Sequence, residues 1–263
     1  MSHAAEERRF LSEYDPSAFE RPSVAVDVVL LSIADGRLAT LLVERAEHPD
    51  KGAWALPGGF VRMTESLDAA AARVLREKAG VSEIFLEQLY TFGDPKRDPR
   101  TRVISVAYYA LVDERRLAAR TVHDSAIARV GVPWEGEAGG PVTLHPSGEA
   151  PSGEALSGER TPLRIAFDHA EIVGTAVKRI RGKLDYAPIG FELLPAAFTL
   201  LDLQRVHETV LGRSLNKDSF RRRMLASGRL APSGASQEDV GHRPAALYRY
   251  LRNLPSAQGG THG

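Results

Sequence analysis

Runs of apolar residues separated by short polar segments occupy the first half of the chain and predict a sheet. Val24–Ser32 (VAVDVVLLS) and Leu38–Glu44 (LATLLVE) are rich in β-branched and aliphatic residues, which favour strands. The Ala-Asp-Gly segment at 34–36 separates these two runs and is a turn signal. Phe85–Tyr90 and Val103–Val112 have the same character and predict two further strands.

A helix is predicted between the second and third of these strands. Thr64 can cap its N-terminus, alanines follow within the helix, and Gly80 stands at the C′ position that ends it. The WALPGGF segment, Trp54–Phe60, leads into this helix. Its paired glycines, Gly58 and Gly59, allow backbone N–H groups to approach a phosphate at the positive helix end. Taken alone, such a pair also fits an ordinary tight turn.

The apolar pattern of the last third of the chain predicts helices followed by a strand. Asp168–Tyr186 has apolar residues near helical spacing, and Leu200–Leu211 is a second amphipathic segment. After a glycine, Arg213–Leu230 contains six Lys or Arg residues and one Asp. Leu247–Leu251 is strand-like. A helix, a short turn, a basic helix and a strand match a helix-turn-helix with a wing.

A repetitive segment separates these two parts. Residues 146–160 run PSGEA-PSGEA-LSGER, three near-copies of a five-residue unit. Such a segment cannot bury enough apolar surface to offset the entropy lost on ordering. We interpret it as an expanded, solvated linker; a regulatory or binding tail is the alternative. The chain is therefore predicted to comprise a domain at 1–135, a low-complexity linker or insertion at 136–162, and a second domain at 163–263.

Composition supports two domains and excludes several classes of protein. No apolar run approaches the roughly 18 residues of a membrane span, and the N-terminus MSHAAEERRF lacks the apolar segment of a signal peptide. The absence of cysteine excludes disulfides and thiolate metal sites and fits a cytoplasmic protein. From Leu163 onward there are 15 Lys or Arg and 9 Asp or Glu, so an acidic first part precedes a basic second part. This asymmetry suggests different partners.

Gly59–Val81 resembles the Nudix box, G-x5-E-x7-R-E-U-x-E-E-x-G-U, where U is aliphatic. The matching positions are Gly59, Glu65, Arg73, Leu75, Glu77, Gly80 and Val81. The two other carboxylate positions hold Val74 and Lys78. Helical spacing predicts that Val74, Glu77 and Lys78 share one face, where a Nudix enzyme binds divalent metal through carboxylates. Because a lysine repels a dication, the pattern predicts a retained scaffold and lost catalysis.

Longer stretches resemble the Nudix-related transcriptional regulators of NAD metabolism. They are WALPGGF, the box, Leu86–Leu111 (LEQLYTFGDPKRDPRTRVISVAYYAL), the YDPS segment with Phe19, and the AFDH segment at 166–169. In that family a Nudix-like domain binds ADP-ribose, and a winged helix-turn-helix binds operator DNA as a homodimer. The resemblance implies an α/β (α+β) Nudix-type mixed-sheet sandwich followed by a winged helix-turn-helix domain. It also implies ADP-ribose as effector, no required cofactor, and a palindromic operator. The insertion at 136–162 departs from the family.

Candidate ligand-binding residues come from the box and its surroundings. Arginines, and Lys78 in place of the missing cation, can neutralise a diphosphate, and aromatic rings can stack on adenine. Core packing is an equally good interpretation of the aromatic members, and Arg73 with Glu77 is also an ordinary i,i+4 ion pair. The candidates are Arg45, Trp54, Gly58, Gly59, Phe60, Arg62, Arg73, Glu77, Lys78 and Phe92.

Candidate DNA-binding residues gather in the basic second part. Asn216 or Asp218 can cap the basic helix. A solvated face is the simpler interpretation of Arg221–Arg223 alone, but the turn spacing and the charge asymmetry favour DNA binding. The candidates are Lys178, Arg181, Asn216, Lys217, Ser219, Arg221, Arg222, Arg223 and Arg243.

Two functions therefore compete. One is a ligand-responsive repressor with a Nudix-type sensor, and the other is a working hydrolase of ADP-ribose or nucleotide sugars with an accessory C-terminal module. The box positions favour the sensor and predict no metal site. RNA binding fits less well, because sequence-specific RNA modules mostly display aromatic stacking platforms. His169, His207 and His242 lack metal-ligand spacing, which favours polar or capping roles.

Overall fold

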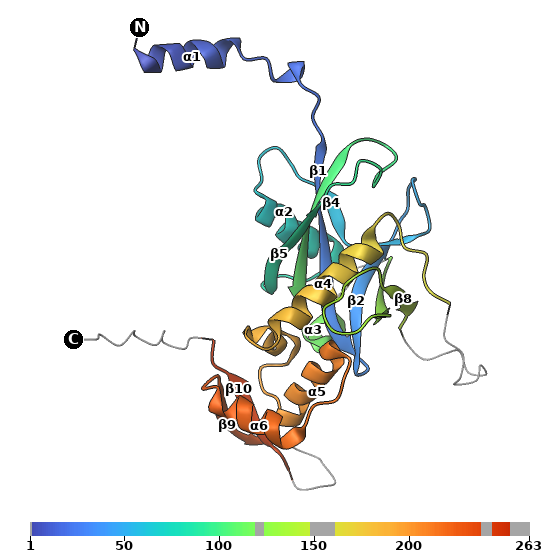
Figure 1. Cartoon of the computed structure of the whole chain (residues 1–263), viewed down its shortest axis with the longest axis vertical. Helices are drawn as coiled ribbons and strands as arrows, with labels where there is room; N and C mark the ends of the chain where they lie inside the picture. Colours follow the sequence, from blue (N-terminus) through green and yellow to red (C-terminus); the bar gives the residue numbers. More distant parts are fainter. Residues whose placement is uncertain (1, 119–123, 148–160, 238–243, 253–263) are drawn as a thin grey trace.

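The computed structural model describes residues 2–118, 124–147, 161–237 and 244–252, which form a helix-covered sheet joined to a smaller unit (Figure 1). Within these residues the sheet order is β5-β6-β1-β2-β7-β8, with β3 paired to β2 and β4 paired to β1. Because β1 and β6 are parallel and the other pairs are antiparallel, the predicted mixed sheet is confirmed. The strands are β1 (Ser23–Ala34), β2 (Arg37–Glu44), β3 (Trp54–Ala55), β4 (Gly58–Phe60), β5 (Phe85–Phe92), β6 (Val103–Leu111), β7 (Ser125–Gly131) and β8 (Thr143–Pro146).

β1 lies inside the sheet and is covered on both faces. Val28 and Leu30 belong to one apolar core, whereas Val29 and Leu31 belong to the other. A strand buried on both faces needs a nearly continuous apolar run, and the VAVDVVLLS segment supplies one. This run therefore requires a layer of helix on each side of the sheet.

Helix α2 (Leu67–Val74) covers the first face and continues as a π turn, Leu75–Ala79, that ends at Gly80 with φ 66°. Thr64 was predicted as its cap, and this is wrong. Ser66 is the N-cap, and its side chain accepts a backbone N–H of the first turn at 3.2 Å. The helix begins later than predicted, so only a hydroxyl at the residue before Leu67 can reach that N–H.

Helix α4 (His169–Lys183) covers the opposite face of the sheet. The α4 residues in the same core as Val29 and Leu31 are Ile172, Val173, Ala176, Val177 and Ile180. Placing residues 163 onward with the DNA-binding part was therefore wrong for α4, because an amphipathic pattern predicts burial but not the surface that provides it. The linker predicted at 136–162 also contains β8, which pairs with β7.

The smaller unit is a winged helix, as predicted. It comprises η3 (Pro188–Leu193), α5 (Leu200–Leu211), α6 (Lys217–Ala226) and the hairpin of β9 (Leu230–Ser236) and β10 (Ala246–Tyr250). Thr199 caps α5 reciprocally with Asp202, and Gly212 ends α5 with φ 69°. Asn216 caps α6, which confirms one of the two predicted caps. The hydrophobic core of the winged helix contains Phe191, Phe198, Leu203 and Phe220.

Helix α5 connects the two units. Leu203 belongs to the core of the winged helix, whereas Val206 and Val210 belong to the core beneath α4. Thr209 also donates its hydroxyl to the carbonyl of Gly36, in the turn between β1 and β2, at 3.3 Å. The winged helix is therefore held to the sandwich by one face of its own first helix.

Arg181 lies buried at this junction, so its predicted DNA contact is wrong. It is only 8% exposed. Its Nε donates to the Val210 carbonyl at 2.8 Å, and its Nη1 donates to the carbonyls of Trp134 and Gly136 at 3.3 and 3.1 Å. The last carbonyls of a helix have no partner within the helix. Arg181 satisfies one of them at the end of α5 and thereby ties α4 to the winged helix.

Two peripheral elements complete the described chain. Helix α3 (Glu114–Ala118) follows β6, and an N-terminal arm formed by α1 (His3–Glu13) and η1 (Pro16–Ala18) precedes β1. The arm extends away from the rest of the chain (Figure 1), and no residue of α1 is buried. None of the described helices combines the length and apolarity needed to cross a membrane.

Replacing Arg181 by Met should lower the free energy of unfolding by about 2–4 kcal/mol, because buried carbonyls lose their donor. Urea titration of the whole chain measures this. Lys178→Met, an exposed position on the same helix, is the matched control and should change stability by less than about 0.5 kcal/mol. Equal urea midpoints for the two variants would show that Arg181 is not a tie between the units.

Candidate ligand cleft and nucleic-acid interface

A cleft of about 430 Å³ opens where β1, β4 and the start of α4 meet. Gly58 and Gly59 line it from β4, Asp27 lines it from β1, and His169 lines it from α4. Arg97 enters from the loop between β5 and β6. These segments are distant in sequence, and the folded sheet brings them together.

A buried ionic network around Asp27 forms one wall of this cleft. Ser105 donates its hydroxyl to Asp27 Oδ2 at 2.5 Å, and Arg97 Nη2 lies 3.5 Å from the same oxygen. Arg97 also binds both carboxylate oxygens of Asp168, with Nε–Oδ2 and Nη2–Oδ1 distances of 2.9 and 2.7 Å. Paired, bidentate geometry of this kind offsets the desolvation of buried charges. The network therefore fixes the β5–β6 loop to the start of α4.

His169 lies beside the network as a neutral ring. Its Nδ1 accepts the backbone N–H of Leu56 at 2.9 Å, so the proton of the neutral ring is on Nε2, 3.7 Å from Asp27 Oδ1. Burial lowers the pKa of His169, although the nearby Asp27 and Asp168 carboxylates oppose that shift. His169 thus has a polar role, as predicted, and positions the backbone just before the glycine pair.

Lys78 and the glycine pair form another part of the wall. A Cβ at Gly58 would lie 2.1 Å from Asp27 Oδ1, so no larger residue fits there. Lys78 donates from Nζ to the Gly58 carbonyl, which places its ammonium in the cleft. Much of the Lys78 side chain remains exposed, but partial desolvation lowers the pKa of its ammonium, opposed by Asp27. A positive group therefore occupies a box position that would otherwise carry a carboxylate.

Val74 does not share a face with Glu77 and Lys78, which corrects the prediction from helical spacing. Val74 is completely buried in the core between α2 and the sheet, whereas Glu77 and Lys78 are exposed. The π turn that begins at Leu75 widens the helix there. The following side chains are therefore displaced around the axis relative to a regular α-helix.

Glu65 is bound by Arg73 and is not free to ligate a cation. Arg73 donates to both Glu65 oxygens at 2.9 and 2.6 Å, to Glu77 at 3.3 Å and to the Phe60 carbonyl at 3.1 Å. The hydrogen bond from Arg73 lowers the pKa of Glu65 to about 2. With an aliphatic group at position 74 and an ammonium at position 78, the box residues do not fit the divalent metal of Nudix chemistry.

The structure brings half of the ligand-binding candidates together. Those that line the cleft are Arg45, Gly58, Gly59, Phe60 and Lys78. Phe92 is buried in the core beneath α4, and Trp54 packs against that core. Arg62 and Arg73 form ion pairs with Glu77 outside the cleft. Core packing therefore accounts for the two aromatic residues, and ion pairing accounts for the two arginines.

Sequence reasoning missed the buried network, although signals for it exist. Asp27 is a single carboxylate within an apolar strand segment, and Arg97 lies in the GDPKRDPRTRV stretch. Asp168 belongs to the AFDH segment, as does Phe167, which adopts φ 52°. Arg45 lies over the Phe167 ring, with Cζ 4.7 Å from its centroid. A strained, non-glycine backbone at a cleft is typical of functional sites.

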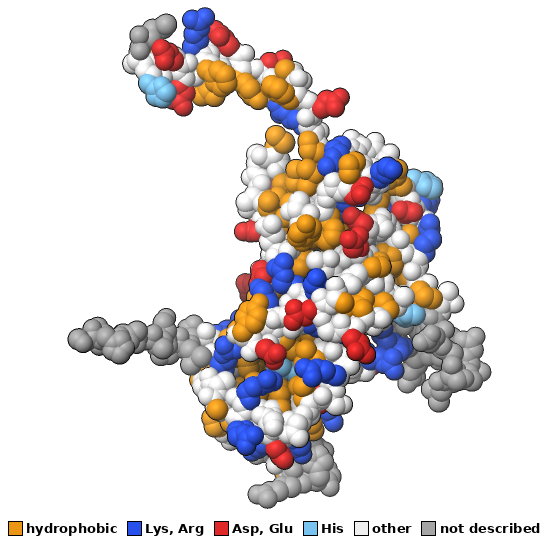
Figure 2. Space-filling model, in the orientation of Figure 1, with side chains coloured by type: hydrophobic (Ala, Val, Ile, Leu, Met, Phe, Trp, Pro, Cys, Tyr) orange, Lys and Arg blue, Asp and Glu red, His pale blue; other side chains and the backbone are white. Residues whose placement is uncertain are grey.

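Helix α6 presents an exposed basic surface, and Figure 2 shows Lys and Arg side chains spread over the winged helix. The exposed candidates on α6 are Lys217, Ser219, Arg221, Arg222 and Arg223. Arg223 is partly engaged, because its Nη1 lies 3.5 Å from Asp185. Asn216 acts as the cap, and Lys178 is exposed on α4 rather than on the winged helix. Arg243 lies outside the described residues.

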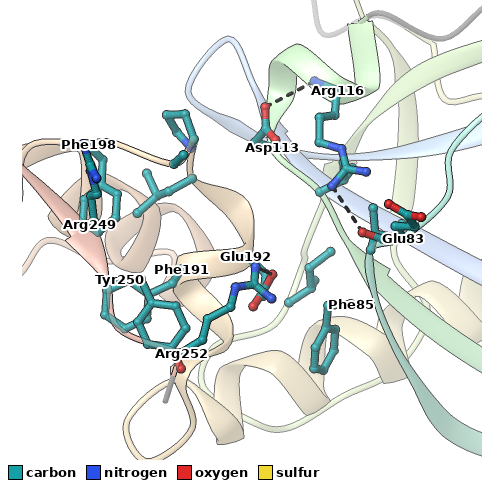
Figure 3. Close-up of a pocket in the computed structure, with 16 residues that line it drawn as sticks. Glu83, Phe85, Asp113, Arg116, Phe191, Glu192, Phe198, Arg249, Tyr250 and Arg252 are labelled. Atoms are coloured by element: carbon teal, nitrogen blue, oxygen red, sulfur yellow. Dashed lines mark hydrogen bonds and ion pairs between the residues drawn. The ribbon is translucent and has the colours of Figure 1, made fainter. Parts of the chain in front are cut away.

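A larger cavity of about 640 Å³ lies between the sandwich and the winged helix (Figure 3). Several charged side chains that line this cavity are already paired with other groups of the chain. Arg116 donates to the Ser82 carbonyl at 2.7 Å, and Arg252 pairs with Glu192 at 2.9 Å. The rings of Phe191 and Tyr250 stack on one another at 4.4 Å. Its lining includes no glycine turn at a helix start, so we assign the candidate ligand site to the smaller cleft.

Two protein-family models match separate parts of this chain. The NUDIX domain matches residues 21–135, and the NrtR DNA-binding winged helix domain matches residues 190–250. The second match begins within η3 and ends with β10, the same unit that the structure forms. The fold class predicted from the sequence is therefore confirmed.

The chain is also similar to regulators over most of its length. The ADPR responsive transcriptional repressor NtrR of Acinetobacter baylyi is 36% identical over 246 residues, which are 93% of this chain and 88% of that relative. Shewanella oneidensis NrtR complexed with a 27mer DNA has a TM-score of 0.67 and 32% identity, covering 87% of this chain and 93% of that one. A MutT/nudix family protein from Enterococcus faecalis has a TM-score of 0.72 and 28% identity, covering 95% and 94%. The chain therefore belongs to the NrtR family of transcriptional regulators, which join a NUDIX domain to a DNA-binding winged helix.

Proposed function

We propose that this chain is a repressor of NAD-metabolism genes that binds operator DNA through α6 and senses ADP-ribose in its cleft without hydrolysing it. The observation that carries the proposal is the combination of a glycine-lined cleft containing the Lys78 ammonium with an exposed basic helix. The Acinetobacter relative is named as ADPR responsive, and the Shewanella relative was crystallised with DNA. The same effector and partner are proposed for this chain.

The cleft has the size and groups that a dinucleotide-like ligand needs. Its volume of about 430 Å³ lies within the range of small-molecule sites. The backbone at Gly58 and Gly59 can approach a diphosphate closely, and Lys78 and Arg45 can neutralise it. The half-exposed ring of Phe60 lies at the same cleft and can stack on adenine.

Lys78 supplies positive charge where an enzyme would need a metal ion. An ammonium can bind a diphosphate directly, whereas Mg²⁺ gives up its water shell reluctantly. Hydrolysis also needs an activated water, and the box lacks two of the carboxylates that metal binding and proton removal require. Binding without turnover is the behaviour expected of a sensor.

DNA recognition is assigned to α6 in a two-fold dimer. Winged helices of this kind place a helix in the major groove, and two copies read half-sites about one DNA turn apart. A homodimer therefore predicts a palindromic operator. Lys217 and Ser219 lie in the first turn of α6, where base edges are read, and Arg221, Arg222 and Arg223 can bind phosphates.

Helix α4 offers a physical connection between the cleft and α6. Its first residue, His169, lines the cleft, and Asp168 before it binds Arg97. Near its other end, Arg181 binds the end of α5. A ligand that favours one position of α4 would favour one orientation of the winged helix. Its effect on DNA affinity is limited by its difference in affinity for the two states.

Wild-type chain should bind ADP-ribose in EDTA, and Lys78→Glu should weaken that binding at least about tenfold because a carboxylate repels the diphosphate. Mg²⁺ should partly restore binding to the variant. Isothermal calorimetry with and without Mg²⁺ measures both effects. Arg76→Glu, the same charge change at an exposed residue of the same helical segment, is the control. If EDTA abolishes wild-type binding, Lys78 does not replace a metal ion.

We expect no Mg²⁺-dependent release of AMP from ADP-ribose above background. The physical reason is the replacement of two box carboxylates by Val74 and Lys78. Chromatographic detection of AMP over a long incubation checks this, with heat-denatured chain as the blank. Sustained turnover by the purified chain would support the hydrolase alternative. Val74→Glu is no simple restoration, because it would place a carboxylate in a core where Val74 is completely buried.

Arg221→Ala combined with Arg222→Ala should weaken operator binding and reduce its dependence on salt. Each lost phosphate contact removes about one unit from the slope of log K against log salt, so the double variant, which loses two contacts in each subunit of the dimer, should lose roughly four units. Fluorescence anisotropy at several salt concentrations, using DNA upstream of neighbouring genes, measures this. By analogy with the family, ADP-ribose should weaken DNA binding by wild type.

The matched control for the double variant is Lys178→Ala, which removes an exposed charge from α4. ADP-ribose binding should be unchanged in both proteins. If the double variant binds DNA as tightly as wild type at every salt concentration, α6 is not the helix that contacts the operator. Equal DNA affinity with and without saturating ADP-ribose would exclude the sensor.

A further inference from the structure

The N-terminal arm, residues 2–22, carries aromatic side chains that are largely exposed to solvent. Phe10 is 63% exposed, Tyr14 47% and Phe19 62%, and no residue of α1 is buried. Their rings form a continuous strip, with centroids of Phe10 and Tyr14 5.7 Å apart and those of Tyr14 and Phe19 6.4 Å apart. Figure 1 shows this arm extending from the body, and Figure 2 shows apolar side chains along it.

A short helix such as α1 is expected to have little stability unless another surface covers its apolar side chains. Helices shorter than about 12–15 residues are marginal in water, and most helical stability comes from packing an amphipathic face. Helix α1 has 11 residues, and none of them is buried. Contiguous exposed apolar side chains of this kind mark interaction surfaces.

We propose that the arm packs on a second copy of this chain and forms the dimer, each arm lying across the partner's body. The surface that receives it is a root patch, Val24 and Met63, which are 36% and 99% exposed. The proposed function requires a dimer, and this inference assigns the arm to the dimer contact. The inference therefore rests on the proposed function.

The position of the root patch favours a second copy as the occupant. The arm ends just before Ser23, the first residue of β1, whose N–H donates to the Arg102 carbonyl at 2.9 Å. Val24 follows at once and accepts the N–H of Val61 at 2.9 Å, so the patch lies beside the point where the arm leaves. A two-fold axis near this point brings each arm over the patch of the other copy. Both arms are then buried by one isologous contact.

Charge and area agree with this arrangement. The arm carries five acidic and three basic residues, whereas the exposed charged residues of the loop at 93–102 beside the root are three basic and one acidic. Aromatic side chains bury roughly 150–250 Å² each, and about half of each ring in the arm is still exposed, so the six rings of two arms and an equal area of the surfaces they cover would remove roughly 1,200 Å² from water. This area is within the range of roughly 1,200–2,000 Å² for stable protein interfaces.

Phe10→Ser combined with Tyr14→Ser should raise the dimer dissociation constant about 100-fold or more, because the two arms lose their buried aromatic groups. Analytical ultracentrifugation of the full chain measures this. The matched control, Glu7→Ser with Arg8→Ser, places two serines in the same helix and removes one charge of each sign, and it should stay within about threefold of wild type. Urea titration should show unchanged stability of the body, since α1 has no buried residue.

Cross-linking tests the receiving surface separately. The chain has no cysteine, so copies carrying Phe10→Cys can be mixed with copies carrying Met63→Cys and treated with a short bis-maleimide. A two-chain product containing one of each is expected, and replacing Met63→Cys by Arg213→Cys should abolish it. Internal cross-linking at high dilution in a chain carrying both cysteines would mean that the arm folds back and would overturn the proposal.

The remaining outcomes separate this inference from the proposed function. A wild-type chain that is monomeric at micromolar concentration, or a Phe10→Ser, Tyr14→Ser variant that dimerises like wild type, would overturn the arm contact. Operator binding by that same variant dimer would leave the repressor function standing. Conversely, an arm-dependent dimer that binds neither operator DNA nor ADP-ribose would keep the arm contact and overturn the function.

Discussion

β1 carries apolar side chains on both faces, and α4 is the helix that covers the face opposite α2. The rest of the structure depends on this packing. Because α4 lies across the sheet, His169 at its start reaches the cleft, and Arg181 near its end reaches the carbonyls of α5. Removing this layer would expose the core and separate the winged helix from the sandwich at once. One hydrophobic contact thus places both functional surfaces.

Buried charges define the position of α4 on the sheet. Apolar contacts hold α4 on the sheet, but the hydrophobic effect is non-directional, whereas a bidentate pair of charges requires a particular geometry. Arg97 binds Asp168 through two hydrogen bonds and approaches Asp27, so the start of α4 has a defined position relative to β1. A ligand near these groups acts on a site whose geometry is already linked to the helix.

The cleft retains the scaffold of a Nudix domain while its chemistry has changed at few positions. Gly58, Glu65 and Arg73 still shape the turn and brace it against α2. The substitutions occupy different surroundings, since Val74 is in the core and Lys78 is in the cleft. An aliphatic group and an ammonium at these positions remove two possible metal ligands and add a positive charge. Sensing and hydrolysis can therefore share one fold.

The sequence by itself determined the principal strands, the helix-turn-helix with its Asn216 cap, and the loss of box carboxylates, because periodicity, capping and charge are local properties. Tertiary structure decided the rest. Nothing local distinguishes Arg181, which is buried, from Arg222, which is exposed. The same holds for α4, whose amphipathic pattern specifies a buried face but not the sheet that covers it. Which surface an apolar face meets, and which charges then converge, depends on contacts between residues far apart in the chain.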